Sequence, residues 1–383
     1  MKKYSLYILF LMGLGAMAGS CTNLDEKIYD RLVDNNFYKN EKDIIAAITP
    51  VYTDYRGLLE WRKWWDFEET TDVAVTPRAA WFDGGIYIRL HKHTWKPEDP
   101  HFSDLWGQAY GGISNCNRVI YQLDNLDFEV TVSADEVKTG STIYMALQKT
   151  LHPSNVKTFN LQTWLDNGVC AVPTFIDTYE EGDKRLPKTW RMGQQYGSDG
   201  SILYCTGLVP GWEGKPLIYT KEVSNLENGG EAEGYRCGKY EIKMGTSRAL
   251  DNDWVAMRYA EVYLMKAECI LRTNGNAEEA AQLVNEVRKR AFDGDNKLSG
   301  ADLLKTTNVN GVPVRFGILL DEWGREFALE GLRRSQLIRF DNNYTKGEWT
   351  FHEPSKETYL NLFPIPLSEI QANNKLEQSE GYK

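Results

Sequence analysis

The chain has 383 residues, of which 42% are hydrophobic, and this is enough to bury a substantial core in two domains or in one large elaborated domain. The formal net charge is −10, which argues against nucleic acid as a partner because a nucleic-acid site needs a surplus of basic residues. The composition is rich in aromatic residues, with 12 Trp and 21 Tyr.

The N-terminus has the pattern of a targeting segment. Two lysines follow the initial Met, and the apolar run over residues 4–18 is shorter than the roughly 20 residues that a bilayer requires. An Ala-Gly-Ser sequence then precedes Cys21, which resembles a bacterial lipobox, where this Cys is lipid-modified and becomes the first mature residue. We predict a lipoprotein-type signal peptide over residues 1–20 and a lipidated tether over 21–30. The alternative is an ordinary secretory signal followed by a chance Cys.

Two helical patterns flank an aromatic stretch in the first third of the chain. Apolar residues recur at helical spacing over residues 34–52 and again over 102–126. Six tryptophans fall within residues 61–106, in a stretch that a proline and an Asp-Gly-Gly run interrupt. We predict loops and short strands over residues 61–95.

A long irregular segment occupies residues 193–245, which are rich in Gly, Tyr and polar residues. Long loops in a compact domain are often functional. Cys205 and Cys237 fall in this segment and could form a disulfide in an oxidising compartment, although the five cysteines after the lipobox are an odd number and cannot all pair. Cys116 and Cys269 fall in apolar helical patterns, where we expect core thiols.

The most regular pattern is a helical hairpin over residues 258–292. Its first arm is apolar on most sides, as a buried helix is, and its second arm carries a single apolar stripe. Residues 274–276, Asn-Gly-Asn, separate the arms, and we expect the Gly to supply the left-handed cap. Glu268 and Arg288 are predicted to pair across the hairpin. Small residues on both arms permit close packing, so we predict one unit of a helical-repeat scaffold.

After the hairpin, the sequence predicts a loop over residues 293–317 and a helix over 318–340. Three acids, Glu322, Glu326 and Glu330, stack at i, i+4 and i+8 on this helix beside several arginines. Paired carboxylates are typical of glycoside hydrolysis. Three acids on one helix next to arginines instead favour ion pairs that support the packing.

With these pieces in order, the chain resembles the SusD/RagB family of outer-membrane nutrient-binding lipoproteins. Four stretches carry the resemblance, and they occur in the order that the family has. They are Cys21 with the acidic leader Asp25-Glu26; Trp106-x3-Tyr110-x2-Ile113-x3-Asn117; Arg258 to Glu268 (RYAEVYLMKAE), continued by Asn285 to Ala291 (NEVRKRA); and Arg325 to Gly331 (REFALEG), followed by Leu362 to Pro366 (LFPIP) and Gln378 to Tyr382 (QSEGY).

The resemblance implies a mainly α fold, namely a tetratricopeptide-like helical-repeat scaffold with long irregular loops and a few short strands. Residues 31–127 would be the SusD-like N-terminal region and residues 128–383 the C-terminal region. The chain is shorter than a typical member, because residues 127–149 hold nothing like the leucine- and alanine-rich helix that the family has there. The loss of repeat helices would leave apolar faces that neighbouring helices should cover.

Sugars present apolar C–H faces and polar rims, so their sites often combine aromatic platforms, whose stacking removes apolar area from water, with polar side chains. The candidate ligand-binding aromatics lie in loop-like sequence and are Trp64, Trp65, Trp81, Tyr196 and Trp212. Candidate polar partners are Arg78, Asp83 and Asn115. For each aromatic residue the alternative is ordinary packing in the core or within a loop.

No catalytic motif, cofactor motif or metal motif emerges from the sequence. His91 and His93 alternate along the chain, but two ligands do not make a metal site. We therefore predict no catalytic residue, no cofactor and no metal.

The expected function is that of a lipid-anchored binding protein on the exterior face of the outer membrane, acting without chemistry. The resemblance implies a SusC-like TonB-dependent transporter as partner, to which the protein would deliver a captured oligosaccharide. Some relatives bind peptides, which is the first alternative. The others are a surface glycosidase that uses Glu326 or Glu330, and a nonfunctional remnant that lacks part of the helical region.

Overall fold

The computed structural model describes residues 40–59, 62–77, 83–124, 149–247, 255, 257–294 and 296–383. The predicted signal peptide, Cys21 and the tether lie outside these residues. The helices are α3 (Glu41–Leu59), α4 (Arg62–Glu69), α5 (Ile86–His91), α6 (Pro100–Asp124), α8 (Val156–Phe159), α9 (Pro173–Ile176), α10 (Arg185–Thr189), α11 (Tyr259–Arg272), α12 (Ala277–Arg288), α13 (Gly300–Leu303), α14 (Gly317–Phe327), α15 (Arg333–Arg339), α16 (Asn343–Lys346) and α17 (Leu367–Ala372), with 3-10 turns η2 (Pro153–Asn155) and η3 (Thr358–Asn361). Within the described ranges, no helix is both long enough and apolar enough to cross a membrane.

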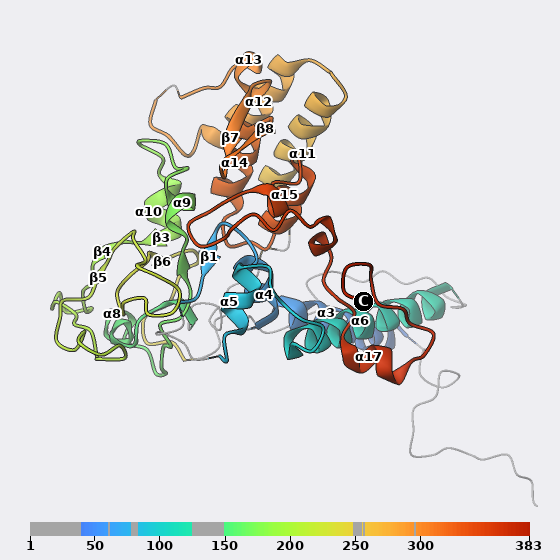
Figure 1. Cartoon of the computed structure of the whole chain (residues 1–383), viewed down its shortest axis with the longest axis horizontal. Coiled ribbons are helices and arrows are strands. Elements are labelled where there is room, and N and C mark those ends of the chain that lie inside the picture. Colours follow the sequence, from blue (N-terminus) through green and yellow to red (C-terminus); the bar gives the residue numbers. More distant parts are fainter. Residues whose placement is uncertain are drawn as a thin grey trace, which may run out of the picture.

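The described strands form two-stranded antiparallel sheets. They pair as β1 (Ala74–Val75) with β2 (Cys170–Ala171), β3 (Trp190–Arg191) with β6 (Arg236–Cys237), β4 (Gly193–Gln194) with β5 (Ile218–Tyr219), and β7 (Thr306–Val309) with β8 (Val312–Arg315). In Figure 1, α11 to α15 form one end of the molecule, α3 and α6 extend at another, and the irregular segment with β3 to β6 forms the third. The predicted fold class, mainly α with a few short strands, is confirmed.

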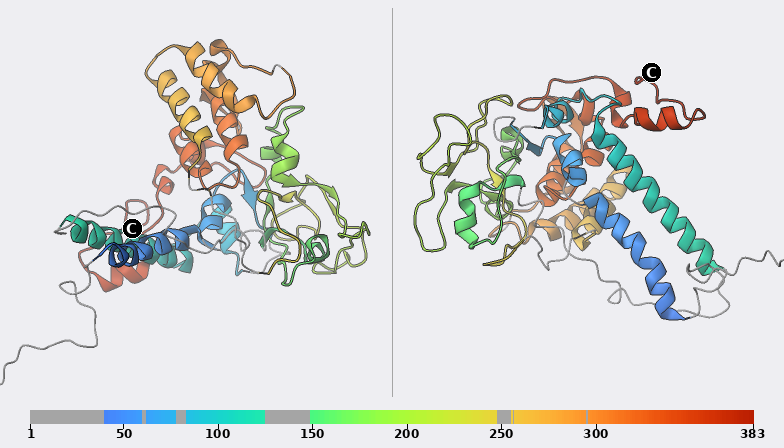
Figure 2. Two further views of the ribbon diagram at one scale, coloured as in Figure 1. Left: turned by 180° about the vertical axis from the view of Figure 1, so that it is seen from behind. Right: turned by 90° about the horizontal axis from the view of Figure 1, so that it is seen from below.

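Helices α3 and α6 lie side by side, as both further views of the molecule show (Figure 2). Asn115 of α6 donates a hydrogen bond from Nδ2 to Oδ2 of Asp54 in α3, at 2.6 Å, which fixes the pair in register. Large apolar side chains on the two helices remain exposed, among them Tyr52, Tyr55, Tyr110, Ile113, Ile120 and Tyr121. The apolar faces that we expected from missing repeat helices are therefore present on this pair, as far as the described residues show.

The predicted helical hairpin is present as α11 and α12, and Asn276 caps α12 by accepting a hydrogen bond from the N–H of Glu278 at 3.0 Å. The left-handed residue at the end of α11 is Asn274, with φ of 55°, so the prediction for Gly275 is wrong. Gly275 is needed for space instead, because a Cβ there would lie 3.2 Å from the carbonyl oxygen of Ile270. The prediction that α11 is buried on most sides is also wrong, since Tyr259 at its start is 70% exposed.

Residues 293–317 are not a simple loop as predicted, because they contain α13 and the hairpin of β7 and β8. Asn310 and Gly311 connect the two strands with φ values of 50° and 78°. Two consecutive positive φ angles define the type I′ turn that Asn-Gly favours, so the dipeptide was a signal that the helix-based interpretation missed. The hairpin packs against α14, and together they form one side of the core.

The segment from α4 into β1 runs through the centre of the core, and Trp65 to Thr76 are buried apart from Phe67. Its acids are tied to the C-terminal half of the chain. Asp72 accepts hydrogen bonds from Nε and Nη2 of Arg333 in α15, both at 2.7 Å, and Glu68 accepts one from the N–H of Gly331 at 2.5 Å. Burial raises the pKa of Glu68 to about 7 and that of Glu69 to about 8. These contacts join elements more than 250 residues apart in sequence into one core.

The five described cysteines have free thiols. Cys205 and Cys237 are buried in different hydrophobic clusters, so the disulfide that the sequence allowed is absent from this structure. Cys269 is exposed and Cys116 only half-buried, and the prediction of core thiols at these two positions is wrong. Both cysteines lie on helix faces that described neighbours leave partly open.

Candidate ligand-binding site

A cavity of about 460 Å³ opens where the irregular segment begins, beside Tyr196. We call it the Tyr196 cavity. Its walls come from α8, α10, β3, β4 and the residue after β6. The lining residues are Thr158, Pro187, Lys188, Trp190, Arg191, Met192, Gln194, Gln195, Tyr196 and Gly238.

Short strands and a tight turn hold Tyr196 at the edge of this cavity. Tyr196 forms an antiparallel bridge with Ile202, and Asp199 closes the turn between them by accepting a hydrogen bond from the N–H of Ser201 at 2.9 Å. Thr158 of α8 donates from Oγ1 to the carbonyl of Tyr196, at 2.8 Å. The main chain is thus fixed on both sides, while the Tyr196 side chain is 50% exposed. An exposed ring on a fixed main chain is suited to stacking against an apolar ligand face.

The polar lining combines amides with cations. Gln194 donates from Nε2 to the carbonyl of Gln195 at 2.9 Å, and Gln195 donates to the carbonyl of Gly193, also at 2.9 Å. The guanidinium of Arg191 lies over the ring of Phe159, 4.7 Å from its centroid. Burial lowers the pKa of Arg191, but an arginine remains charged at neutral pH. Main-chain carbonyls thus engage the nitrogens of both amides, and the cavity offers a ligand the ring, the amide oxygens and positive charge.

Trp212 lies in a second, neighbouring loop that Glu231 holds in place. The buried carboxylate of Glu231 accepts hydrogen bonds from the N–H groups of Thr206, Gly207 and Val209, at 2.5, 3.0 and 3.3 Å. Trp212 is half-buried against Gly230, where a Cβ would come within 2.1 Å of the indole. Its position is well defined, but Trp212 does not line the Tyr196 cavity.

One group of side chains within the described ranges has the composition of a metal site. Ligand atoms of His152, Cys205 and Glu231 lie within 4.8 Å of one another, and all three residues are buried. However, Nδ1 of His152 accepts a hydrogen bond from the N–H of Ser154 at 3.0 Å, so Nε2 carries the proton and donates to Glu231 at 2.5 Å. Hydrogen bonds account for this arrangement without an ion.

Two further histidines, His91 and His93, are packing residues. Both are buried, and His91 accepts a hydrogen bond at Nε2 from the indole of Trp349, at 3.1 Å. His93 stacks on Tyr344, with ring centroids 4.2 Å apart. The prediction of loops and short strands over residues 61–95 is wrong here, because His91 ends α5 and His93 follows in a turn.

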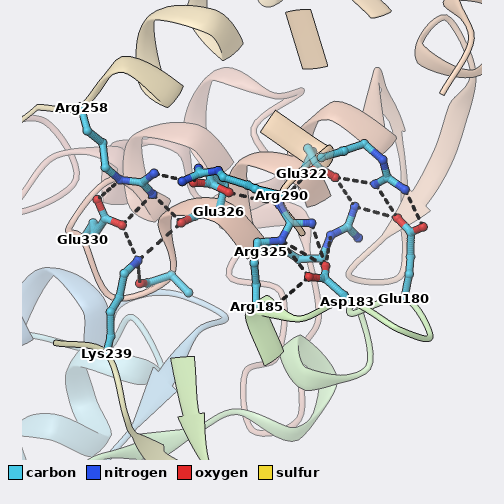
Figure 3. Close-up of polar contacts among 12 residues, drawn as sticks. Glu180, Asp183, Arg185, Lys239, Arg258, Arg290, Glu322, Arg325, Glu326 and Glu330 are labelled. Carbon is cyan, nitrogen blue, oxygen red and sulfur yellow. Dashed lines mark hydrogen bonds and ion pairs between the residues drawn. The ribbon is translucent and has the colours of Figure 1, made fainter. Parts of the chain in front are cut away.

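The three acids of α14 and the following residues are bound by cations, as the ion-pair interpretation predicted (Figure 3). Glu322 contacts Arg185, Arg288 and Arg325 at 2.6, 2.7 and 2.8 Å. Glu326 contacts Arg258, Arg290 and Arg185, and Glu330 contacts Arg258 and Lys239. Burial raises the pKa of Glu330, but Lys239 and Arg258 lower it further, so that the net shift is downward. Carboxylates held in this way are poor general acids, which argues against a glycosidase centre here.

The predicted pair between Glu268 and Arg288 is wrong. Glu268 instead contacts Arg272 and Arg339, at 2.8 and 2.9 Å. Arg288 contacts Glu180 and Glu322 on the other side of α12, at 2.8 and 2.7 Å.

The candidate site residues from the sequence are distributed over several environments. Tyr196 lines the cavity, while Trp65 is fully buried and cannot reach a ligand in this arrangement. Trp81, Arg78 and the side chain of Trp64 lie outside the described part of the chain. Asp83 accepts hydrogen bonds from the N–H groups of Gly85 and Tyr87, and Asn115 is occupied with Asp54, so these two polar candidates have local structural roles.

Sequence reasoning missed Lys188, Arg191, Gln194 and Gln195, although they surround the one aromatic candidate that lines the cavity. A signal was available in the sequence, because residues 190–196 read WRMGQQY, with polar side chains between two aromatic residues. Only residues 193–196 of this stretch fall in the predicted irregular segment, for which the sequence indicates no regular structure.

Known proteins similar to this chain in sequence come from one family. A model of the SusD family matches residues 171–382. The starch-binding protein SusD of Bacteroides thetaiotaomicron is 34% identical over 205 residues, which cover 51% of this chain and 33% of that protein. A SusD-like protein of Formosa agariphila is 35% identical over 131 residues, covering 33% of this chain and 23% of that protein. The chain therefore aligns with about a third or less of the length of these relatives.

Solved structures share the fold at lower identity. A SusD-like protein from Bacteroides fragilis has a TM-score of 0.59 and 15% identity, with 91% of this chain and 99% of that chain covered. Surface glycan-binding protein A from Bacteroides thetaiotaomicron, solved in complex with laminarihexaose, has a TM-score of 0.55 and 15% identity, with 89% and 99% covered. At this identity the likeness establishes the architecture, which is helical and of the SusD type.

Proposed function

Because this chain belongs to the SusD family, we propose that it captures an oligosaccharide at the cell surface without converting it chemically. The observation that carries the proposal is the Tyr196 cavity, which lies within the part of the chain that the family model matches and its flanking helix α8. An exposed ring beside amide and cationic groups is suited to a ligand with apolar faces and polar rims. A relative with 34% identity over 205 residues is named for starch binding, which supports a glycan as the ligand class.

The first test is direct binding with the Tyr196→Ala variant. Covering one ring face of roughly 60 Å² contributes about 1.5 kcal/mol at ~25 cal/mol per Å², so we expect a roughly tenfold loss of affinity for the glycan that binds best. Isothermal titration of the mature chain against neutral and acidic oligosaccharides and a peptide panel measures this loss.

The matched control for that experiment is Tyr204→Ala. Tyr204 is 49% exposed in the same irregular segment but does not line the cavity. Equal losses from the two variants would remove the Tyr196 cavity as the site. Binding of peptides in preference to every glycan would replace the oligosaccharide by a peptide as the ligand.

The proposal extends to location and partner. A lipid on Cys21 would hold the mature chain at the outer membrane, and the helical end formed by α11 to α15 would face a SusC-like TonB-dependent transporter that takes up the captured ligand. The Ala-Gly-Ser-Cys sequence supports the anchor, and family membership supports the transporter.

The anchor can be tested by cell fractionation of the Cys21→Ser variant. A single acyl chain gives only marginal binding to a membrane and several chains give stable attachment, so loss of the lipidated Cys should release the protein. We expect the parent chain in the outer-membrane fraction and the variant in the soluble fraction. A variant that stays in the membrane fraction would contradict attachment through Cys21.

A further inference from the structure

We propose that the Tyr196 cavity takes an acidic oligosaccharide, one that carries carboxylate or sulfate groups, and that Arg191 and Lys188 recognise its negative charge. The inference rests on the proposed function and names the ligand class of the same site. It makes Arg191 and Lys188 specificity-determining residues.

The first observation is the charge of the cavity wall. Among the described residues that line it, Lys188 and Arg191 are cationic, and none is acidic. This composition runs against the chain as a whole, which has 54 acidic and 44 basic residues. Positive charge concentrated in a concave site of an acidic protein favours an anionic ligand and increases its local concentration.

The second observation is the state of the Arg191 guanidinium. Buried arginines elsewhere in the described structure have polar partners: Arg288 contacts Glu322 and Arg333 contacts Asp72, while Arg236 donates to the carbonyl oxygens of Glu233 and Gly234. The guanidinium of Arg191 has no ion pair or hydrogen bond to any described residue, and its Nε is buried without a partner. The residue is half-buried, and withdrawing a cation from water without a counter-ion is costly, so the energetics favour an anion at this position.

The surroundings of Arg191 explain why the protein itself does not neutralise this charge. The titratable side chains that act on it are Tyr219 and Cys237, and burial raises their pKa values to about 12 and about 11, so both are neutral at pH 7. Packing nevertheless orients the side chain, since its guanidinium lies 4.7 Å from the ring centroid of Phe159. Gly238 leaves room for its stem, because a Cβ there would lie 3.2 Å from Cγ of Arg191. Arg191 is therefore held in place and left available to a ligand.

The third observation concerns Lys188, which lies in the last turn of α10 and also lines a neighbouring cavity of about 280 Å³. That cavity contains Arg185, Arg258, Arg290 and Lys239, each of which contacts Glu322, Glu326 or Glu330. Lys188 is exposed and has no ion pair in the described ranges. Lys188 therefore lines both the Tyr196 cavity and its neighbour, and its charge is not neutralised by any described carboxylate.

These groups match the chemistry of an acidic sugar chain. A guanidinium presents a planar fork of N–H donors that fits a carboxylate or a sulfate, and a lysine adds a flexible point charge. Tyr196 and the side-chain amides would contact the uncharged parts of the same chain. The cations alone do not distinguish a uronic acid from a sulfate ester, so the experiment includes both.

The experiment is titration calorimetry on the mature chain with two pairs of matched probes. One pair is oligogalacturonate and its methyl ester, and the other is a sulfated dextran oligosaccharide and unmodified dextran. We expect at least one acidic probe to bind at least tenfold more tightly than its neutral counterpart, with an affinity that falls as salt is added. Arg191→Gln should reduce that preference about tenfold and Lys188→Gln about threefold, while Arg191→Lys should retain part of it.

One control variant tests whether the loss of any surface charge weakens binding, and Lys188→Gln provides a second test of the inference. Lys375→Gln removes the same charge from an exposed C-terminal position without a described ion pair, and it should leave binding unchanged. Lys188 is exposed, so its variant tests the inference even if Arg191→Gln proves unstable in thermal unfolding.

The outcomes separate this inference from the proposed function. Neutral probes that bind as tightly as acidic ones, with a loss in Tyr196→Ala, would overturn the acidic specificity and leave glycan capture intact. An acidic preference that survives both cation variants would overturn the roles of Arg191 and Lys188. Failure of every glycan to bind would overturn both proposals.

Discussion

We expect the Arg333→Met variant to lose about 3–5 kcal/mol of its free energy of unfolding, because it leaves the buried carboxylate of Asp72 without its counter-ion. Both side chains are about 1% exposed, and the guanidinium contacts both carboxylate oxygens at 2.7 Å. It also donates from Nη1 to the carbonyl of Leu320, at 2.9 Å. Removing it uncouples the segment before β1, α14 and α15 at one point of the core. Urea unfolding followed by tryptophan fluorescence measures the loss.

Two further variants identify the cause. Combining Arg333→Met with Asp72→Leu removes both charges and should recover a large part of the loss, since an apolar pair avoids the buried carboxylate. Lys266→Gln breaks an exposed ion pair with Glu279 and should leave the unfolding midpoint unchanged. A double variant as unstable as Arg333→Met would show that packing, and not charge, dominates. A parent chain that unfolds without cooperativity would favour the interpretation of this protein as a nonfunctional remnant.

The sequence indicates which charged residues form ion pairs, but it does not identify their partners in space. The ion pairing of the three acids was predicted from nearby arginines and an i, i+4, i+8 spacing, and it is confirmed. The single helix predicted over residues 318–340 is wrong, because α14 ends at Phe327 and Glu330 lies beyond it. None of the partners across the fold could be named from the sequence. The Glu268–Arg288 pair was wrong because spacing within a hairpin gives the face of each helix but not the element that covers it. Glu268 is satisfied from α15, which is 71 residues away in sequence.

The burial of the aromatic candidates likewise depends on the elements around them, which their local sequence does not identify. Trp65 and Tyr196 both appeared in loop-like sequence, but residues 62–69 form α4, which turns Trp65 into the core. Tyr196 lies two residues after β4 and pairs through an isolated bridge with Ile202, and its side chain remains 50% exposed. Arg191 could not have been selected from sequence, since a single arginine carries no signal of whether an acid lies beside it in space.

The second large effect is expected from Glu322→Gln, which removes the charge that three arginines share. Glu322 is fully buried, and Arg185, Arg288 and Arg325 all contact it within 2.8 Å (Figure 3). An amide of the same size keeps the packing but exposes these guanidiniums to one another in a low-dielectric environment. We expect a loss of about 3–5 kcal/mol in the free energy of unfolding at pH 7. Glu286→Gln, on the exposed side of α12, is the matched control and should be neutral.

The pH dependence of this loss distinguishes charge from shape. Burial raises the pKa of Glu322, but Arg325, Arg185 and Arg288 together lower it well below the ordinary value. The unfolded state therefore binds a proton at higher pH than the folded state, and the stabilisation is complete above the unfolded pKa of roughly 4.5 and declines as pH falls toward the folded pKa. The difference in stability between the parent and Glu322→Gln should accordingly be constant from pH 5.5 to 7 and shrink between pH 4.5 and 3. If the difference in stability stays constant down to pH 3, the loss in Glu322→Gln comes from altered packing. The negative charge of Glu322 would then not be what stabilises the three arginines.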